Sequence, residues 1–414
     1  MTKFKSIAKN VTYFLTLSLF AHLANAAPKS VVLADKEKLK AIDAEILQSH
    51  AELNVAVALV SETQKDQLSH LAHEHGACGG YEFLAYENNP LNWTQDQNPL
   101  NQLLAQKKIN ESYANKFSVL SAYPTPAMVV NENIQKAVDA VDQGLVGETI
   151  RWLSVDYPSR YNRLSDPNKH VVDLKNRVEA MAQEAGRSAV VEMVDHNSTR
   201  QKSLRVRLLG SDRPSEVVVL GGHLDSITSF NRGDAPGADD NASGSAAVLE
   251  AYRLVLLQKP NPRTIEFIWY AGEESGLLGS AEIAADYKNK GVDVVGVMQL
   301  DMTGFPGSGE LMFANIGDFT SVWLQDYLKT INSMYVKATV IETACGYGCS
   351  DHASWYRQGF PAVFPFEAEF NDYNSNIHTS RDKIELLSFP HVAMFAKLAL
   401  AFVLDLSNSN LRHP

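Results

Sequence analysis

One short stretch decides the fold of this chain, Val217-Val218-Val219-Leu220-Gly221-Gly222-His223-Leu224-Asp225. Its first four residues are apolar without alternation, which is typical of a strand that is buried on both faces. Two further apolar runs, 264–270 and 292–300, follow along the chain, and helix-like segments separate the three. Strands that alternate with helices predict an α/β domain with a central mixed, mostly parallel sheet flanked by helices.

The same alternation continues on both sides of this stretch. Helices are expected at 133–155, 170–186, 243–258, 278–288, 321–335, 352–358 and 389–406, and strands at 189–194, 203–209 and 362–366. Pro124, Pro126 and the polar residues 131–133 mark a boundary before the regular pattern begins. We therefore expect a single α/β domain at 131–408, a C-terminal tail at 409–414, and a smaller segment at 27–130.

The first 26 residues have the pattern of a secretory signal peptide. Lys3, Lys5 and Lys9 are basic, residues 11–23 form an apolar run, and Ala24-Asn25-Ala26 offers small residues at the cleavage position. The run is shorter than the ~20 apolar residues that a spanning helix needs, so cleavage is favoured over a membrane anchor. The sequence predicts a protein that the export machinery secretes, via the periplasm, with no membrane span in its mature form.

Composition excludes several classes of protein. The chain has 414 residues, with 37 Lys and Arg against 48 Asp and Glu, and no basic stretch that would bind nucleic acid. Three cysteines are too few for a disulfide scaffold. The 24 glycines and 16 prolines follow no repeat, which excludes collagen-like and low-complexity chains. The composition is that of a soluble globular protein.

Histidines and carboxylates gather where the predicted strands end. Each of the three apolar runs is followed by at least one of them, and others precede the next helix or follow the last strand. Because ligands of open α/β sheets bind at the carboxyl ends of the strands, we expect these side chains to form one spatial cluster. They are His223, Asp225, Asp239, Asp240, Glu273, Glu274, Asp301 and His378.

This cluster predicts a site for two divalent cations. Carboxylates crowded into one site raise one another's pKa, and cations remove the repulsion. Two imidazoles with several carboxylates suit zinc, with Mn²⁺ or Co²⁺ as possible substitutes. The donors are too many for one open zinc site, so two cations about 3.5–4 Å apart with a bridging carboxylate fit better. Asp225 can accept the second imidazole N–H of His223. One of the neighbours Glu273 and Glu274 can bind metal while the other acts as a base.

Six stretches also carry a resemblance to a known family. They are Gly221-Gly222-His223-Leu224-Asp225-Ser226, Ala235-Pro236-Gly237-Ala238-Asp239-Asp240-Asn241-Ala242-Ser243-Gly244, Ala271-Gly272-Glu273-Glu274-Ser275-Gly276-Leu277, Gln299-Leu300-Asp301-Met302, Cys345-Gly346-Tyr347-Gly348-Cys349-Ser350-Asp351-His352-Ala353-Ser354-Trp355, and residues 370–379. In these stretches the sequence resembles the zinc aminopeptidases of the M28 peptidase family, especially secreted bacterial leucyl aminopeptidases. The resemblance covers about 131–408, in the family's order of motifs, and implies a single catalytic α/β domain.

The resemblance implies two zinc ions per subunit. One would be held by His223 and Asp301, and the other by Glu274 and His378, with Asp240 bridging both. Spacing alone would not separate Asp240 from its neighbour Asp239, so this assignment depends on the matching motif. His352 is interpreted as a structural histidine, because the ligand set is complete without it.

The resemblance also implies how a substrate would be bound and cleaved. Glu273 would be the general acid/base, and Tyr347 would hydrogen-bond the developing oxyanion. An apolar pocket for a Leu-like first side chain would be formed by Met302, Phe366, Phe370, Tyr373 and Ile377, for which ordinary core packing is the alternative. The implied protein is an exported monomeric aminopeptidase that acts on peptides with a free N-terminus.

Cys345 and Cys349 flank a Gly-Tyr-Gly turn that is tight enough for a disulfide, and the resemblance implies this bond as well. Thiolate metal ligands are the alternative. The disulfide would position Tyr347.

The segment 27–130 contains no readable motif, and we interpret it as a propeptide that aids folding or inhibits. His73, His75 and Cys78 form a short cluster there, which favours a surface loop over an inhibitory metal contact. A carboxypeptidase or dipeptidase, a glutaminyl cyclase and a non-catalytic binding module remain as alternatives for the whole protein.

Overall fold

The run Val217–Leu220 lies in strand β7 (Arg213–His223), inside a six-stranded sheet. In spatial order the sheet consists of β12 (Ala362–Val363), β9 (Asp293–Gln299), β7, β8 (Arg263–Tyr270), β6 (Ser203–Leu208) and β5 (Val190–Val194). The first four strands run parallel, and β6 and β5 are each antiparallel to the neighbour before them. The prediction of a mixed, mostly parallel sheet is confirmed.

This computed structural model describes residues 29–73, 81–86, 98–114, 129–228 and 233–412. The predicted signal peptide, 1–26, lies outside the described residues, as do His75 and Cys78. His73 is the last residue of a helix.

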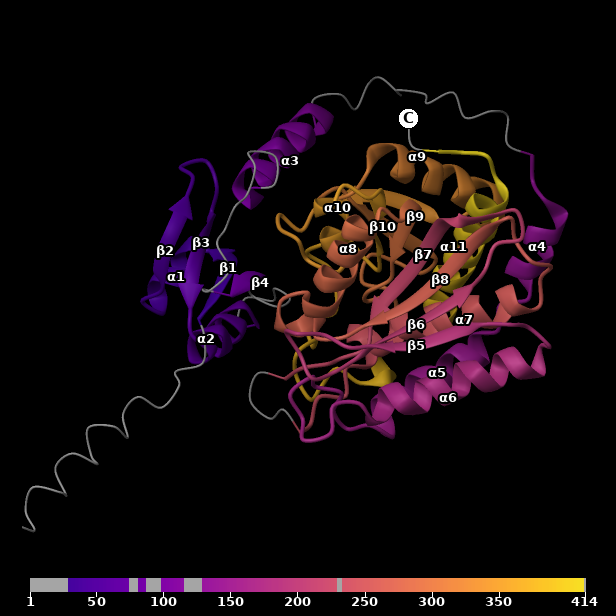
Figure 1. Ribbon diagram of the computed structural model, residues 1–414, viewed down its shortest axis with the longest axis horizontal. Coiled ribbons are helices and arrows are strands. Elements are labelled where there is room, and N and C mark those ends of the chain that lie inside the picture. Colours follow the sequence, from indigo (N-terminus) through magenta and orange to yellow (C-terminus); the bar gives the residue numbers. More distant parts are fainter. Residues whose placement is uncertain (1–28, 74–80, 87–97, 115–128, 229–232, 413–414) are drawn as a thin grey trace, which may run out of the picture.

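Alternate residues of β7 face two different layers of helices. Val218 and Leu220 pack in a core with helices α4 (Glu132–Asp139), α5 (Gln143–Val155), α6 (Lys169–Glu184), α7 (Gly244–Leu256), α9 (Val322–Ile331) and α11 (Phe389–Asn408). Val217 and Val219 pack in a second core with α8 (Leu278–Lys290) and α10 (His352–Arg357). Both faces of the sheet are therefore covered, which is why the run is apolar without alternation (Figure 1).

Three boundaries differ from the sequence prediction. The helix expected at 133–155 is two helices, α4 and α5, because Asp142 caps the second one by accepting the backbone N–H groups of Gly144 and Leu145. The strand expected at 362–366 is divided between two sheets. Its second part, β13 (Pro365–Phe366), pairs with β10 (Met312–Ile316), which pairs with β11 (Thr339–Thr343). The helix expected at 321–335 ends at Ile331 and continues as a wide turn, η4 (Asn332–Val336).

The described part of the N-terminal segment folds as a separate small unit beside the large sheet (Figure 1). We call residues 29–114 the N-terminal subdomain. Its elements are β1 (Ser30–Asp35), α1 (Lys36–Ala41), β2 (Glu45–Ser49), β3 (Val55–Val60), α2 (Glu62–His73), β4 (Tyr81–Tyr86) and α3 (Pro99–Ala114). The four strands form an antiparallel sheet in the order β2-β3-β1-β4.

The two faces of this small sheet have different partners. Val32 and Ala58 face the residues of α1 and α2, including Leu39 and Leu68. The alternate residues of β1 and β3, such as Val31 and Val57, face α3 and the large domain. The large domain contributes Leu277, Phe319 and Ala353 to this contact. The N-terminal subdomain is therefore attached to the large domain through an apolar contact.

Helix α11 is the only helix among the described residues that is long and apolar enough to cross a membrane. In the fold, however, 78% of its most apolar 18-residue window is buried. A membrane-spanning helix and a buried core helix can have the same length and composition. The burial of α11 is that of a core helix.

Candidate metal centre

The sheet brings the predicted site residues to one edge. His223 is the last residue of β7, and Asp301 lies two residues beyond the end of β9. Glu273 and Glu274 begin a short turn, η3 (Glu273–Ser275), that follows β8. The other two come from loops: Asp240 precedes α7 in the segment η2 (Ala238–Ser243), and His378 lies between β13 and α11. All six are at most 4% exposed.

Their donor atoms form two groups that share one carboxylate. His223 Nε2 lies 3.0 Å from Asp240 Oδ1 and 3.2 Å from Asp301 Oδ1. His378 Nε2 lies 2.8 Å from Asp240 Oδ2 and 3.2 Å from Glu274 Oε2. Each oxygen of Asp240 therefore faces a different histidine, and each histidine faces one further carboxylate.

This donor set fits two cations. Zinc binds nitrogen and oxygen ligands at about 2.0–2.2 Å, so two ligands of one tetrahedral ion lie roughly 3.3 Å apart. The four separations above are 2.8–3.2 Å. One ligand atom each from His223, Asp240 and Glu274 lies within 4.8 Å of the others. The carboxylate oxygens of Asp240 and Glu274 are buried, and among the described residues none of them accepts a hydrogen bond.

The charges of the site make a cation favourable. Burial and then the charge of Asp240 raise the pKa of Glu274 to about 7. Burial raises the pKa of Glu273 well above its usual value, with repulsion from Glu274 and Asp301 adding to it. Burial also raises the pKa of Asp240, but the adjacent imidazoles of His223 and His378 outweigh it and hold this pKa well below its usual range. Positive charge at this position would relieve the crowding of carboxylates.

Asp239 and Asp240 have different surroundings although they are adjacent. The Asp239 carboxylate accepts hydrogen bonds from the backbone N–H of Gly304 and the side-chain amide of Asn374, each at 3.0 Å. It therefore faces away from the two histidines. The geometry agrees with Asp240, not Asp239, as the shared carboxylate.

Asp225 has a broader role than the sequence suggests. Its carboxylate lies 3.5 Å from His223 Nδ1, while its own backbone oxygen lies closer to that nitrogen, at 3.1 Å. The carboxylate also accepts the backbone N–H groups of Glu273 and Glu274, at 3.0 and 3.3 Å. It therefore holds the turn that carries both glutamates.

Three supporting residues were missed by the sequence analysis. Ser350 Oγ donates to Asp301 Oδ2 at 2.6 Å, and Asp382 accepts the backbone N–H groups of Asp239 and Asp240. The fully buried Arg160 donates to the backbone oxygens of residues 153, 224, 236 and 237, and so joins the loop before η2 to β7. Ser350 lies within a matched motif, but no local pattern marks Asp382 or Arg160, because their partners are distant in sequence.

An apolar pocket adjoins the cluster. It is lined by all five residues predicted for it, Met302, Phe366, Phe370, Tyr373 and Ile377, together with Asp301, Tyr347, Cys349 and Phe364. The rings of Phe370 and Tyr373 pack against each other, with centroids 5.4 Å apart. A pocket with aromatic walls and a carboxylate at one side fits an apolar side chain next to a polar reacting group.

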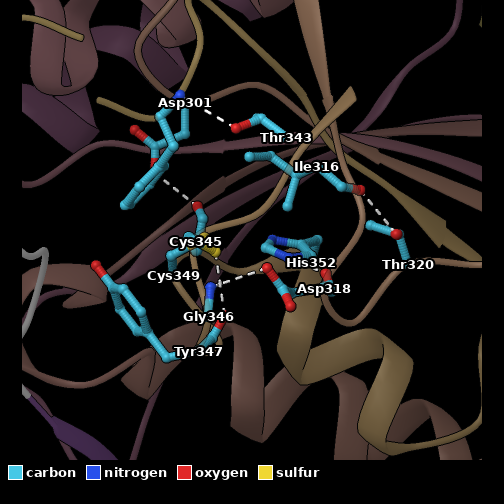
Figure 2. Close-up of a disulfide and its surroundings, with 12 residues drawn as sticks. Asp301, Ile316, Asp318, Thr320, Thr343, Cys345, Gly346, Tyr347, Cys349 and His352 are labelled. Carbon is cyan, nitrogen blue, oxygen red and sulfur yellow. Dashed lines mark hydrogen bonds between the residues drawn. A yellow bond between two sulfur atoms is a disulfide. The ribbon is translucent and has the colours of Figure 1, made fainter. Parts of the chain in front are cut away.

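Cys345 and Cys349 form a disulfide beside this pocket. Figure 2 shows Tyr347 projecting from the loop that the disulfide closes, with Gly346 donating its backbone N–H to Asp318 at 2.9 Å. His352 lies beside the loop in Figure 2, and its Nε2 faces the backbone oxygen of Asp318 at 3.1 Å. Burial lowers the pKa of His352 to about 3, in keeping with a neutral structural histidine outside the cluster.

Comparisons with known proteins identify the family to which this chain is similar. Residues 204–403 match the profile of peptidase family M28. A probable leucine aminopeptidase of Trichophyton verrucosum is 42% identical over 241 residues, which cover 56% of this chain and 65% of that protein. Leucine aminopeptidase 1 of Trichophyton equinum is 38% identical over 309 residues, which cover 70% of this chain and 82% of that protein. The match thus spans slightly less than two thirds of the length of the first relative and 82% of the length of the second.

The fold is also similar to solved structures. The crystal structure of the Legionella pneumophila LapA aminopeptidase superimposes with a TM-score of 0.78 at 29% identity, covering 93% of this chain and 100% of that chain. The aligned region therefore includes most of the N-terminal subdomain as well as the large domain. From the motifs, their geometry and these similarities, the chain belongs to peptidase family M28.

Proposed function

We propose that this protein is an exported aminopeptidase that hydrolyses the N-terminal residue, preferably Leu-like, from peptides. The observation that carries the proposal is the placement of Asp240 between two histidines, next to an apolar pocket that Asp301 also lines. A substrate whose first side chain occupies this pocket would have its first peptide bond close to the cluster.

Two zinc ions would be held by residues of this chain. His223 and Asp301 would hold one, Glu274 and His378 the other, and Asp240 both. Zinc in such a site lowers the pKa of water and polarises a carbonyl oxygen. Mn²⁺ and Co²⁺ accept the same nitrogen and oxygen donors and would be substitutes.

Glu273 would carry out the proton transfers. Its backbone N–H is held by Asp225 at 3.0 Å, and its side chain lines a cleft beside the cluster. From this position Glu273 would take a proton from the attacking water and pass one to the leaving amine. Tyr347 lines both this cleft and the apolar pocket, so its hydroxyl can hydrogen-bond the carbonyl oxygen as negative charge develops there.

Export and processing are part of the proposal. Residues 1–26 would be removed as a signal peptide, which would leave a secreted monomer with no membrane span. Residues 27–130, which include the N-terminal subdomain, would be a propeptide that is removed later, as in a zymogen. N-terminal sequencing of the secreted protein tests both cleavages. A final form that begins near residue 27 would contradict removal of the propeptide.

The activity is tested with aminoacyl anilides, with metal analysis of the same purified protein. We expect about two zinc ions per chain and fastest turnover of the Leu anilide. We also expect loss of turnover after chelation, recovery with zinc, and no cleavage of an N-acetylated Leu anilide. Cyclisation of N-terminal Gln peptides without cleavage of the Leu anilide would instead indicate a glutaminyl cyclase.

A further inference from the structure

The N-terminal subdomain contacts the loops that carry the proposed catalytic groups. The backbone N–H of Phe83 in β4 donates to the backbone oxygen of Gly276 at 3.3 Å, three residues after Glu273. An added Cβ on Gly276 would lie 2.9 Å from the ring of Tyr81, so the two backbones approach closely at this glycine. Strand β4 is thereby held against the turn that carries Glu273 and Glu274.

A second contact of β4 reaches the disulfide loop. Glu82 forms an ion pair with Arg357 of α10, and the side chains are only 13% and 10% exposed. Both side chains lie near Gly348, since a Cβ there would be 3.3 Å from Arg357 and 3.7 Å from Glu82. Gly348 is next to Tyr347, so β4 contacts both loops of the proposed mechanism.

Between the two parts of the chain lies a cavity of about 220 Å³. The large domain contributes Glu273, Leu277 and Tyr347 to its wall, and the N-terminal subdomain contributes Leu33, Val55 and Tyr81 among others. The cavity shares Tyr347 and Cys349 with the apolar pocket. A peptide with its first side chain in that pocket would therefore place the residues after its first peptide bond in this cavity.

The cavity is small for a peptide. Sites for drug-sized ligands measure about 300–1,000 Å³. A volume of 220 Å³ leaves room for roughly one or two residues beyond the first peptide bond. The cavity is partly open, and the subdomain lines part of its wall with Leu33, Val55 and Tyr81, which narrows the space for a longer leaving peptide.

That wall carries an ammonium group suited to a peptide's C-terminus. Lys38 lines the cavity, and no ion-pair partner of its ammonium is found in the described part of the chain. Its two neighbours on α1 are engaged: the Lys36 ammonium donates to the backbone oxygen of His50, and Lys40 pairs with Glu37 at 2.7 Å. The nearby Asp35 carboxylate is occupied by the backbone N–H groups of Glu37 and Lys38 and by the Asn54 amide.

We propose that, while the N-terminal subdomain is attached, the protein cleaves short peptides, of two or three residues, much faster than longer ones, and that Lys38 binds their C-terminal carboxylate. This inference rests on the proposed aminopeptidase function and assigns its substrate class before any removal of the propeptide. The subdomain then acts as a size filter, and its removal would open the site to longer peptides.

The length limit is tested on the full chain, with its intact mass checked before and after each assay. The substrates are Leu-Ala, Leu-Ala-Ala and Leu followed by five alanines. We expect kcat/KM for the six-residue peptide to be at least tenfold below that for Leu-Ala-Ala. Equal values on the uncleaved chain would overturn the inference and keep the aminopeptidase function.

The role of Lys38 is tested by comparing Leu-Ala with Leu-Ala amide, which lacks the terminal carboxylate. In Lys38→Ala the ratio of the two kcat/KM values should fall about two- to fivefold, as expected for a partly exposed ion pair. Lys38→Glu should lower it further, and Lys40→Ala, two residues along the same helix, should leave it unchanged. An unchanged ratio in both Lys38 variants would overturn the assignment of Lys38.

Two other outcomes are distinguishable. A full chain that cleaves no substrate, but cleaves all of them after protease treatment has removed the subdomain, would mean that the subdomain blocks the site completely. That result overturns the size filter and keeps the enzyme. If neither form cleaves the Leu anilide with zinc present, the proposed function fails and the inference fails with it.

Discussion

The Asp382 carboxylate accepts the backbone N–H of Asp240 at 3.0 Å, and thereby holds the segment whose side chain faces both histidines. Its other oxygen accepts the backbone N–H of Asp239, also at 3.0 Å. Asp382 is only 1% exposed, so these bonds are shielded from water. In the described part of the chain no hydrogen bond or ion pair joins Asp382 to His223 or His378, and its role is to position Asp240.

Replacement of Asp382 should therefore weaken metal binding. In Asp382→Ala we expect zinc affinity to fall about 10- to 100-fold, because groups that orient metal ligands contribute effects of this size. Zinc release to a chromophoric chelator measures this without reference to activity. Asp286→Asn, an exposed change on α8, is the matched control. Wild-type zinc affinity in Asp382→Ala would exclude the positioning role.

Glu273→Gln should separate metal binding from turnover. The amide keeps the shape of the side chain but cannot carry protons between water and the leaving amine. We expect the zinc content to stay at the wild-type level and kcat/KM for the Leu anilide to fall by about 10²–10⁴-fold. Glu184→Gln, an exposed change at the end of α6, should alter neither. Retention of near-wild-type turnover would remove Glu273 from the mechanism.

Arg160 should be essential to the stability of the large domain. Burial lowers its pKa to about 10, so the side chain remains charged at neutral pH. Arg160→Met would leave four backbone oxygens without their donor, which should cost about 3 kcal/mol or more of unfolding free energy. Urea unfolding followed by the fluorescence of the buried Trp269 and Trp355 measures the loss. Arg151→Met, at an exposed position of α5, should shift the midpoint little.

Glu282 should make stability depend on pH in the acid range. It accepts the backbone N–H groups of Asn197 and Ser198, at 2.9 and 2.8 Å. Burial would raise its pKa, but the His196 imidazole 3.7 Å away and the hydrogen bonds from Ser198 and Asn197 outweigh burial and lower the pKa from 4.5 to about 2. A lowered folded-state pKa means that this stabilisation is complete above the unfolded-state value and disappears as the pH falls from 4.5 toward 2.

Glu282→Gln should therefore be less stable than the wild type by about 2 kcal/mol at pH 7. The difference should shrink as the pH falls through this range, because the wild-type carboxylate becomes protonated. Urea unfolding of both proteins at neutral and acid pH measures the difference directly, and other carboxylates cancel in the comparison. A difference that stays constant down to the acid end would contradict the assigned role.

Much of the large domain could be predicted from local pattern. The run from Val217 to Leu220 identifies a strand with two buried faces, and His223 and Asp301 mark strand ends where polar groups would be costly inside the sheet. The N-terminal sheet could not be predicted in this way. Its β1 pairs with β3 and β4, so its order depends on contacts between distant segments.

By itself the sequence determined the class of fold, the family and the chemistry of the donors, because strand periodicity, motif order and residue type are local properties. Only the tertiary structure decided which of two adjacent aspartates faces both histidines, since that depends on Asp382 and Asn374 more than 130 residues away. It likewise decided that the N-terminal subdomain covers the cleft beside Glu273. That contact joins segments far apart in the chain, Phe83 with Gly276 and Glu82 with Arg357, and no local pattern encodes such a pairing.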